Sequence, residues 1–338
     1  PDPNQVSRLS EAIMTDIFSL AVSNLVTPII LSFALGLVAA FARSDLTIPE
    51  AVAKGMSIYL LFAIGFKGGA GVAAHGLDRV LVLSLLAGLV LSFILPFIAF
   101  ALLRMMSRLS VIDAAAVAAH YGSISIVTFV AASSLLESSG IAAEGYMVAV
   151  AAVMEAPAIL SALWLVERNG SGRKFDAELG REIMLNGSIV LLVGAFLIGL
   201  ATGAKGMAQI SPFIVAPFQG VLCLFLLDMG LVAGRGLRGA RGVLGLSTVL
   251  FGLFMPLISA SVGLALGLLI GLSPGGIVLM MVLSASASYI AVPAAMRVAL
   301  PEANPTIYLT LSLGVTFPFN LTIGIPLYLA VVQAITGG

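Results

Sequence analysis

Long apolar segments dominate this sequence and leave few folds open to it. A helix that crosses the hydrocarbon core of a bilayer needs about 20 consecutive, mostly apolar residues. Ten such segments follow one another along the 338 residues, separated by short polar connections. Only 9% of the residues are charged, whereas about a quarter are charged in a typical soluble domain. The sequence therefore predicts an all-α polytopic membrane protein with ten transmembrane helices.

The ten segments fall into two groups of five. The longest polar connection, residues 167–182, separates a first group within residues 1–166 from a second group within residues 183–338. The expected spans are 24–42, 54–74, 80–103, 111–136 and 144–166, followed by 183–202, 213–234, 243–271, 275–299 and 304–332.

Basic residues gather in alternate connections, a bias that sets the orientation of membrane proteins. With both termini outside the cytoplasm, twelve of the 16 Lys and Arg residues fall in cytoplasmic connections, and residues 167–182 form a cytoplasmic linker. The other four are Arg8, Arg79, Lys205 and Lys67, the last of which lies inside a span. The twelve are Arg43, Lys54, Arg104, Arg108, Arg168, Arg173, Lys174, Arg181, Arg235, Arg238, Arg241 and Arg297.

An odd number of spans in each group gives the two groups opposite orientations. If the groups are related, they are inverted repeats, an arrangement found in secondary transporters with a binding site at the repeat interface. A faint sequence trace supports this relation, because Ser123 and Ser125 match Ser286 and Ser288 at an offset of 163 residues.

The fourth and ninth spans each carry a cluster of small and hydroxyl side chains near the middle. Matching interruptions in two halves point to helices broken at mid-membrane and to a transporter site. Freed N–H and C=O groups need partners there, and the N-terminus of a half-helix suits a small anion. Ordinary helix packing, for which Gly, Ala and Ser are common, is the alternative. The candidate anion-binding residues are Gly122, Ser123, Ile124, Ser125, Ser286, Ala287 and Ser288.

A carboxylate, Glu155, lies near the middle of the fifth span. Ionisable groups at that depth are costly and usually functional. The corresponding part of the tenth span holds Thr316 and Asn320. Because hard cations prefer oxygen ligands, we predict that Glu155, Thr316, Asn320 and Ser284 hold a sodium ion. A structural hydrogen bond is the alternative role for these side chains.

Three further polar residues lie inside spans. Lys67 and Asp228 either pair with each other as structural charges or face a subunit contact or the substrate path. His120 precedes the first serine cluster, and both helix packing and a place in the site are open to it.

Several classes of function lack their signatures in this sequence. The single cysteine, Cys223, cannot form an internal disulfide. Equal numbers of basic and acidic residues, 16 of each, give no basic excess for binding nucleic acid. Neither an H-E-x-x-H zinc motif nor a phosphate-binding P-loop occurs. We therefore expect no enzyme and no cofactor beyond a coupling ion, with transport driven by an ion gradient.

Motifs spread over almost the whole chain resemble one family. Residues 48–51 and 65–69, the two serine clusters and, most specifically, the stretch Gly-Val-Thr-Phe-Pro-Phe-Asn at 314–320 resemble the SbtA-type sodium-dependent bicarbonate transporter family, which is related to the bile-acid/sodium symporter group. The resemblance implies a gate domain from spans 1, 2, 6 and 7 and a core domain from spans 3–5 and 8–10. It also implies bicarbonate and sodium as substrates, a homotrimer in the bacterial inner membrane and, in cyanobacterial members, inhibition by a PII-like protein on the cytoplasmic face.

Two departures from the cyanobacterial pattern leave the substrate and the partner open. Residues 125–128 read Ser-Ile-Val-Thr rather than a Gly-Ser-Thr-Met type of sequence, and Glu155 stands where those members have Asp. The predicted function is sodium-coupled bicarbonate symport into the cell by alternating access. The alternatives are a sodium symporter for another small carboxylate, a passive anion channel, and a membrane receptor or scaffold.

Overall fold

The computed structural model describes residues 26–76, 78–155, 157–169, 181, 185, 187–239 and 244–337. Across these residues the chain is helical and has no β-strand. Eight segments in this part are long and apolar enough to cross a membrane. They are Glu50–Ala74, Arg79–Met106, Val111–Ser138, Met147–Arg168, Gly187–Ile214, Phe218–Gly239, Leu246–Ile270 and Pro305–Thr336.

The sequence predicted ten spans, and the difference lies in two short segments. The first predicted span, 24–42, corresponds to α2 (Pro28–Phe41), which has 14 residues, and residues 24 and 25 lie outside the described part. The ninth, 275–299, is divided into α13 (Pro274–Ala285) and α14 (Ala291–Ala299), so neither half has the length of a span. Most of the linker 167–182 also lies outside the described residues.

Capping side chains set the start of several helices. Asp78 Oδ1 accepts the N–H of Leu81 at 2.7 Å, and Ser110 Oγ accepts the N–H of Asp113 at 3.0 Å, which satisfies N–H groups that lack a helical partner. The other helices are α3 (Glu50–His75), α4 (Arg79–Met106), α5 (Val111–Gly122), α6 (Ile126–Ser138), α7 (Met147–Val153), α8 (Pro157–Arg168), α10 (Gly187–Ile214), α11 (Phe218–Gly239), α12 (Leu246–Ile270), α15 (Pro305–Leu309), α16 (Phe317–Phe319) and α17 (Ile325–Thr336), with π-helices η1 (Thr310–Thr316) and η2 (Asn320–Gly324).

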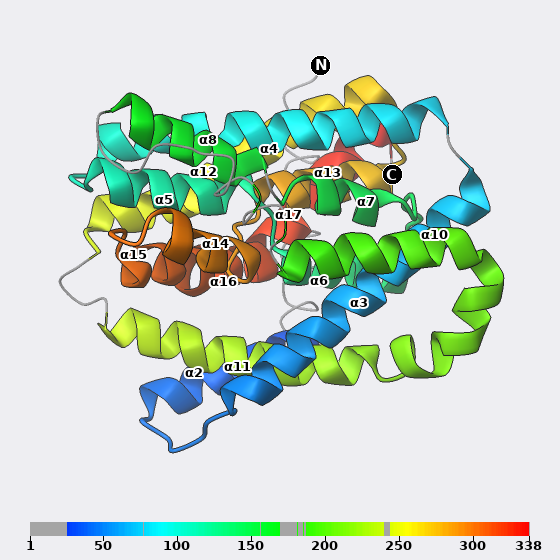
Figure 1. Cartoon of the computed structure of the whole chain (residues 1–338), viewed down its shortest axis with the longest axis horizontal. Coiled ribbons are helices and arrows are strands. Elements are labelled where there is room, and N and C mark those ends of the chain that lie inside the picture. Colours follow the sequence, from blue (N-terminus) through cyan, green and yellow to red (C-terminus); the bar gives the residue numbers. More distant parts are fainter. Residues whose placement is uncertain are drawn as a thin grey trace, which may run out of the picture.

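The helices pack in two layers. α2 packs mainly against α11 and α3 against α10, and these four helices form the lower layer of Figure 1. The remaining helices form the upper layer, in which α4 contacts α5, α8 and α12, and α13 contacts α12 and α17. Each pair in the lower layer joins a helix from before the central linker to one from after it.

Glycines bring the main chains of α2 and α11 into direct contact. Gly36 of α2 faces the carbonyl oxygen of Leu227, and Gly230 of α11 faces the carbonyl oxygen of Phe33. A Cβ at either glycine would collide with these main-chain atoms. Small residues of this kind let membrane helices approach closely.

The contact between α3 and α10 repeats this pattern. Gly69 of α3 faces the carbonyl oxygen of Phe196, and Gly199 of α10 faces the carbonyl oxygen of Phe66. In both pairs of the lower layer, each helix therefore places at least one glycine against the main chain of the other.

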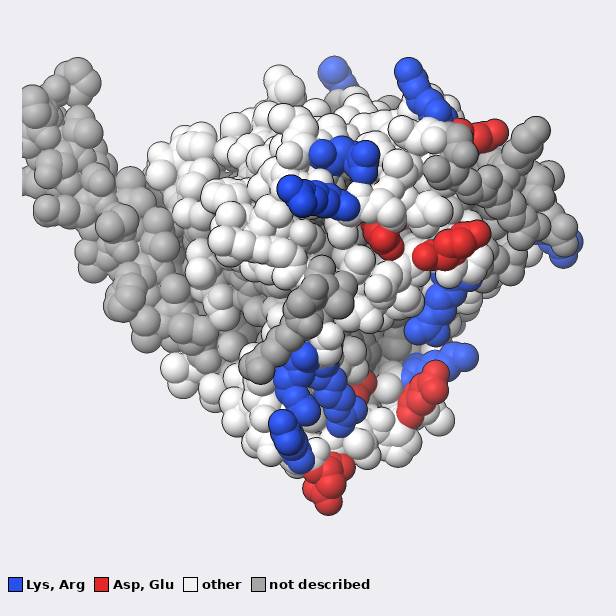
Figure 2. Space-filling model, turned by 90° about the vertical axis from the view of Figure 1, so that its left-hand side faces the viewer, with Lys and Arg blue, Asp and Glu red and all other residues white. Residues whose placement is uncertain are grey.

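Basic side chains gather at one end of the molecule. Figure 2 views the end at the left of Figure 1, where the loop between α2 and α3 lies, and shows many Lys and Arg side chains there. Arg238 of α11 donates to Ala40 O at 2.7 Å and Arg235 donates to Leu46 O at 2.8 Å, so both fasten that loop region to α11. The sequence assigns these arginines to the cytoplasmic side, and that assignment stays a prediction.

The glycine contacts predict a position-specific loss of stability. Gly199→Ala places a Cβ against the main chain of α3, and overpacking of this kind costs about 1–3 kcal/mol. Gly194→Ala on the same helix is the matched control, because no atom lies within 4 Å of the position that its Cβ would take. Thermal unfolding of the purified protein in detergent should show a lower melting temperature for Gly199→Ala only. Equal melting temperatures would contradict the close contact.

Candidate functional site

The first helix break separates α5 from α6. α5 ends at Gly122, which lies against the ring of Pro96 and has no room for a side chain. Ser123 is extended, and Ser125 caps α6 by accepting the N–H of Thr128 at 3.2 Å. The break lies where the first serine cluster predicted it.

The second break separates α13 from α14. α13 ends at Ala285, and Ser286 is extended. Two carbonyl groups at this end of α13 have side-chain donors: Ala285 O accepts from Asn320 Nδ2 at 2.9 Å, and Leu283 O accepts from Ser286 Oγ at 3.0 Å. This break also lies where the sequence predicted it.

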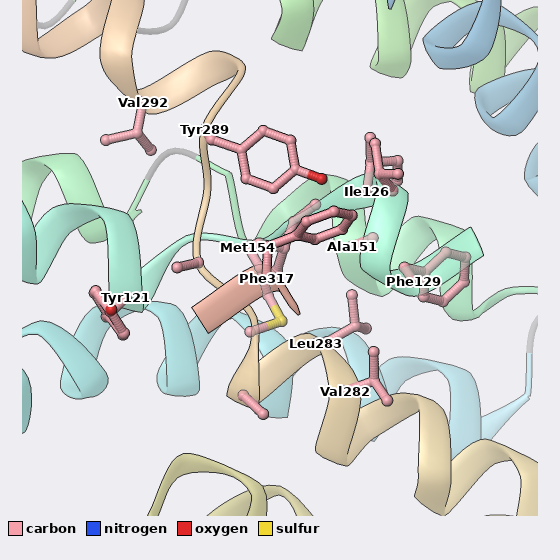
Figure 3. Close-up of a cluster of buried hydrophobic side chains, with 14 of the residues drawn as sticks. Tyr121, Ile126, Phe129, Ala151, Met154, Val282, Leu283, Tyr289, Val292 and Phe317 are labelled. Atoms are coloured by element: carbon pink, nitrogen blue, oxygen red, sulfur yellow. The ribbon is translucent and has the colours of Figure 1, made fainter. Parts of the chain in front are cut away.

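The two breaks cross and are joined by hydrogen bonds. The Ser125 N–H donates to Ser286 Oγ at 2.9 Å, and the Ser288 N–H donates to His120 O at 2.8 Å. Figure 3 shows the segment that leads from α13 to α14 passing across the segment that joins α5 to α6. We call this arrangement, residues 122–126 and 285–291, the crossing.

Glu155 lies beside the crossing in a third interruption. The side chain is 4% exposed, and Ser123 Oγ donates to its Oε2 at 3.2 Å. Glu155 stands between α7, which ends at Val153, and α8, which begins at Pro157, a residue that has no N–H to continue the hydrogen bonds of α7. The freed Met154 O accepts from Ser92 Oγ at 2.6 Å. The sequence predicted a fifth span over 144–166, and one candidate span, Met147–Arg168, lies there; the structure adds an interruption at Glu155.

A small cavity lies between the crossing and the lower layer. It has a volume of about 10 Å³, roughly the room that one water molecule needs. An anion of several heavy atoms therefore enters only if the two layers move apart. Its walls include Ser125 and Ser288 of the crossing, Glu155, Tyr289, Leu61 of α3 and Ser188 of α10.

Three hydroxyl groups on the wall of this cavity donate no hydrogen bond in the described part of the chain. Ser125 Oγ accepts from the N–H and the hydroxyl of Thr128, at 3.2 and 2.8 Å. Ser288 Oγ accepts from the N–H of Val292 at 3.4 Å. The buried Tyr289 hydroxyl lies near the side chains of Ser125 and Thr128 but makes no hydrogen bond of good geometry in the described part of the chain. The wall of this cavity thus combines spare hydroxyl donors with a carboxylate.

The other two serines of the crossing use their hydroxyl protons within the protein. Ser123 donates to Glu155, and Ser286 donates to Leu283 O while it accepts from Ser125. They therefore hold the crossing and Glu155 in place. Gly122, Ile124 and Ala287, the other residues predicted for the anion site, belong to the same crossing, and Ile124 also lines the cavity.

The other residues predicted to bind sodium are engaged elsewhere in this conformation. Thr316 Oγ1 donates to Gly252 O at 2.6 Å and lies 2.6 Å from the Tyr121 hydroxyl. Asn320 Oδ1 accepts from Tyr328 at 3.0 Å, and Ser284 donates to its own helix. Among the described residues, no hydrogen bond joins any of the three to Glu155, and their role at a cation stays a prediction.

His120 contributes its main chain to the crossing. Its Nδ1 lies 2.6 Å from Ala116 O and so carries the proton, and its ring stacks on Tyr308 with 4.4 Å between centroids. The buried Nε2 has no partner among the described atoms.

Lys67 and Asp228 lie in the lower layer and do not line the small cavity. Lys67 Nζ stands 4.5 Å above the ring of Phe218, and Asp228 is 7% exposed on α11. No ion pair between the two residues occurs in the described structure, so the alternative in which they pair with each other is not found there.

Sequence reasoning missed Tyr289 and Ser92. Tyr289 follows Ser288 directly, and a large hydroxyl residue after a run of small residues in a span was a usable signal. Tyr289 packs edge-on against Phe317 at 5.2 Å, and Figure 3 shows its hydroxyl pointing towards the start of α6. Ser92 had no such signal, because its partner Met154 is 62 residues away.

Comparison with known proteins assigns the family. A comparison with curated proteins finds no match. The family model described as the Na+-dependent bicarbonate transporter superfamily matches residues 28–333, nearly the whole chain and every part of the site. The chain therefore belongs to the Na+-dependent bicarbonate transporter superfamily.

Proposed function

We propose that the protein is a secondary active transporter that carries bicarbonate into the cell together with sodium. The observation that carries the proposal is the small cavity at the crossing, where hydroxyl donors of both helix breaks lie beside Glu155. Family membership supports bicarbonate and sodium as the transported ions.

In this proposal, the crossing binds bicarbonate. The anion accepts hydrogen bonds from the spare hydroxyl protons of Ser125, Ser288 and Tyr289. The N-terminus of α6 faces the same cavity through Ile126 and adds partial positive charge. Hydrogen bonds to a charged group are stronger than neutral ones, so the site favours an oxyanion over a neutral molecule.

Glu155 supplies the negative charge of the sodium site. A lone carboxylate this deeply buried is costly, and a sodium ion beside it offsets that cost. Sodium then lies close to the anion, so each ion stabilises the binding of the other, and this coupling is reciprocal. Thr316, Asn320 and Ser284 complete the cation site only after a rearrangement that releases their present hydrogen bonds.

Alternating access follows from the two layers. The lower layer of α2, α3, α10 and α11 acts as the gate, and the upper layer acts as the core that carries both helix breaks. The cavity between the layers is too small for bicarbonate, so relative movement of the layers opens the site first to one side and then to the other.

The matched glycine contacts support an inverted repeat of five plus five helices. Gly36 and Gly199 correspond at the offset of 163 residues that also relates the two serine clusters. In this proposal α2 corresponds to α10 and α3 to α11, with repeats at residues 1–166 and 183–338.

The setting of the protein is part of the proposal. The distribution of Lys and Arg supports an inner-membrane protein with both termini outside the cytoplasm. The family resemblance supports a bacterial source, a homotrimer and a PII-like regulatory protein on the cytoplasmic face. The transporter family also fits a protein that is not an enzyme.

The first prediction concerns the spare hydroxyl groups. Ser125→Ala together with Ser288→Ala removes two donors to a charged ligand, each worth about 1.5–3 kcal/mol, and should raise the KM for bicarbonate at least tenfold. The assay is sodium-driven uptake of radiolabelled bicarbonate into liposomes that contain the purified protein. Ser161→Ala, another buried serine away from the crossing, should behave like the wild type. An unaltered KM in the double variant would refute the anion site.

The second prediction separates a symporter from a passive channel. Glu155→Gln removes the charge that holds sodium, so uptake should fall at least tenfold and lose its dependence on the sodium gradient. The measurement is the initial uptake rate across a sodium titration, with and without a gradient. A passive anion channel needs no cation site, and full flux through Glu155→Gln would support that alternative. Competition by a panel of small carboxylates would show whether bicarbonate is the preferred anion.

A further inference from the structure

A second and much larger cavity lies between the two layers. Its volume is about 530 Å³, and it begins one turn of α6 beyond the crossing, at Phe129 and Val130. Lys67 and Gly68 of α3 and Gln219 of α11 line it from the lower layer. It therefore lies next to the small cavity of the site and has room for a hydrated ion.

Lys67 brings a positive charge into this cavity from inside a membrane span. In the described structure, no hydrogen bond or ion pair holds its ammonium group, which stands 4.5 Å above the ring of Phe218. A ring face replaces only part of the hydration that an ammonium group loses in a membrane. Charged residues at such depth mark ion pathways.

The acidic residues that line the same cavity do not neutralise Lys67 by direct contact. Glu144 Oε1 and Oε2 accept the N–H and the hydroxyl of Ser273 at 2.7 and 2.9 Å, at the start of α13. Glu137 lies at the exposed end of α6 and makes no direct ion pair with Lys67, although its charge attracts the ammonium group at longer range. The ammonium group therefore lacks a direct acidic partner in the described structure and lines the open volume with Glu137 as its longer-range counter-charge.

We propose that Lys67 forms an entry site for a small oxyanion in this cavity, where the transported anion is held before it reaches the crossing. This inference rests on the proposed function and names a residue and a route that lie outside the central site. Gln219 of α11 follows Phe218 and lines the same cavity, and its amide can donate to the same anion. An entry site acts on capture: the Lys67 charge attracts an anion at short range, against the opposing field of the Glu137 and Glu144 carboxylates that line the same cavity.

The first experiment compares Lys67→Gln with Lys205→Gln in the liposome assay at saturating sodium. Lys67→Gln should raise the KM for bicarbonate about five- to tenfold and leave the maximal rate within about twofold. Lys205→Gln loses the same charge on α10 outside the cavity and is the matched control. Lys67→Arg keeps the charge and should recover most of the lost affinity. A wild-type KM in Lys67→Gln, or a lower maximal rate with an unaltered KM, overturns the entry site.

The second experiment does not depend on transport. Ser133→Cys, in a background of Cys223→Ser, places one reactive thiol on the cavity wall. When each rate is divided by that of the same reagent with a free thiol in solution, an anionic methanethiosulfonate should be favoured over a cationic one, and bicarbonate should slow the anionic reagent. Adding Lys67→Gln should abolish both effects, whereas adding Lys205→Gln should preserve them. Equal effects with and without Lys67 overturn the proposal.

The two experiments separate failure of the entry site from failure of the proposed function. If the wild type shows no sodium-driven uptake, the proposed function fails, and protection of the thiol by bicarbonate still tests the entry site. If the wild type transports and Lys67→Gln alters neither KM nor protection, the entry site alone fails.

Discussion

The hydrocarbon core of a membrane contains no water that could form hydrogen bonds with the main-chain N–H and C=O groups freed where a helix is interrupted. The arrangement of the upper layer follows from that constraint. Each break in α5–α6 and α13–α14 exposes main-chain groups, and each finds partners on the other break or on a neighbouring helix. Ser288 bonds to His120 O, and Asn320 bonds to Ala285 O. A third interruption, at Glu155, has its freed carbonyl satisfied by Ser92. The hydrogen bonds that stabilise the breaks therefore also bring Glu155 next to them.

The same interruptions divide the hydroxyl groups into two kinds. The hydroxyl groups of Ser123 and Ser286 donate hydrogen bonds within the protein and hold the crossing and Glu155 in place. The hydroxyl groups of Ser125 and Ser288 only accept hydrogen bonds, so each can still donate one to a ligand. A small cavity of about 10 Å³ lies against the crossing, with a cavity of about 530 Å³ close by between the same two layers. The larger cavity has room for a hydrated ion, whereas the smaller one has room for about one water molecule.

Periodicity and composition predict the helical class, the positions of both breaks and the carboxylate beside them, because serine clusters and a buried acid are local signals. Local signals of this kind do not predict which hydrogen bonds each individual side chain makes. Ser284, Thr316 and Asn320 suggested a cation site in the sequence, yet each is bonded to a neighbouring main-chain carbonyl in the fold. The atom that accepts each of these hydrogen bonds can belong to a residue far away along the chain, as for Thr316 and Asn320. The interruption at Glu155 also escaped prediction, since an apolar run around a proline reads as one span.

The glycine contacts of the lower layer have a consequence for how the chain is made. α2 pairs with α11 and α3 pairs with α10, so each contact joins the beginning of the chain to its second half. The ribosome releases α2 and α3 long before their partners exist. During that interval the grooves at Gly36 and Gly69 are filled by lipid tails or by the insertion machinery. Biogenesis of this protein therefore includes a docking step inside the bilayer, in which α10 and α11 close both grooves after the first half of the chain has been made.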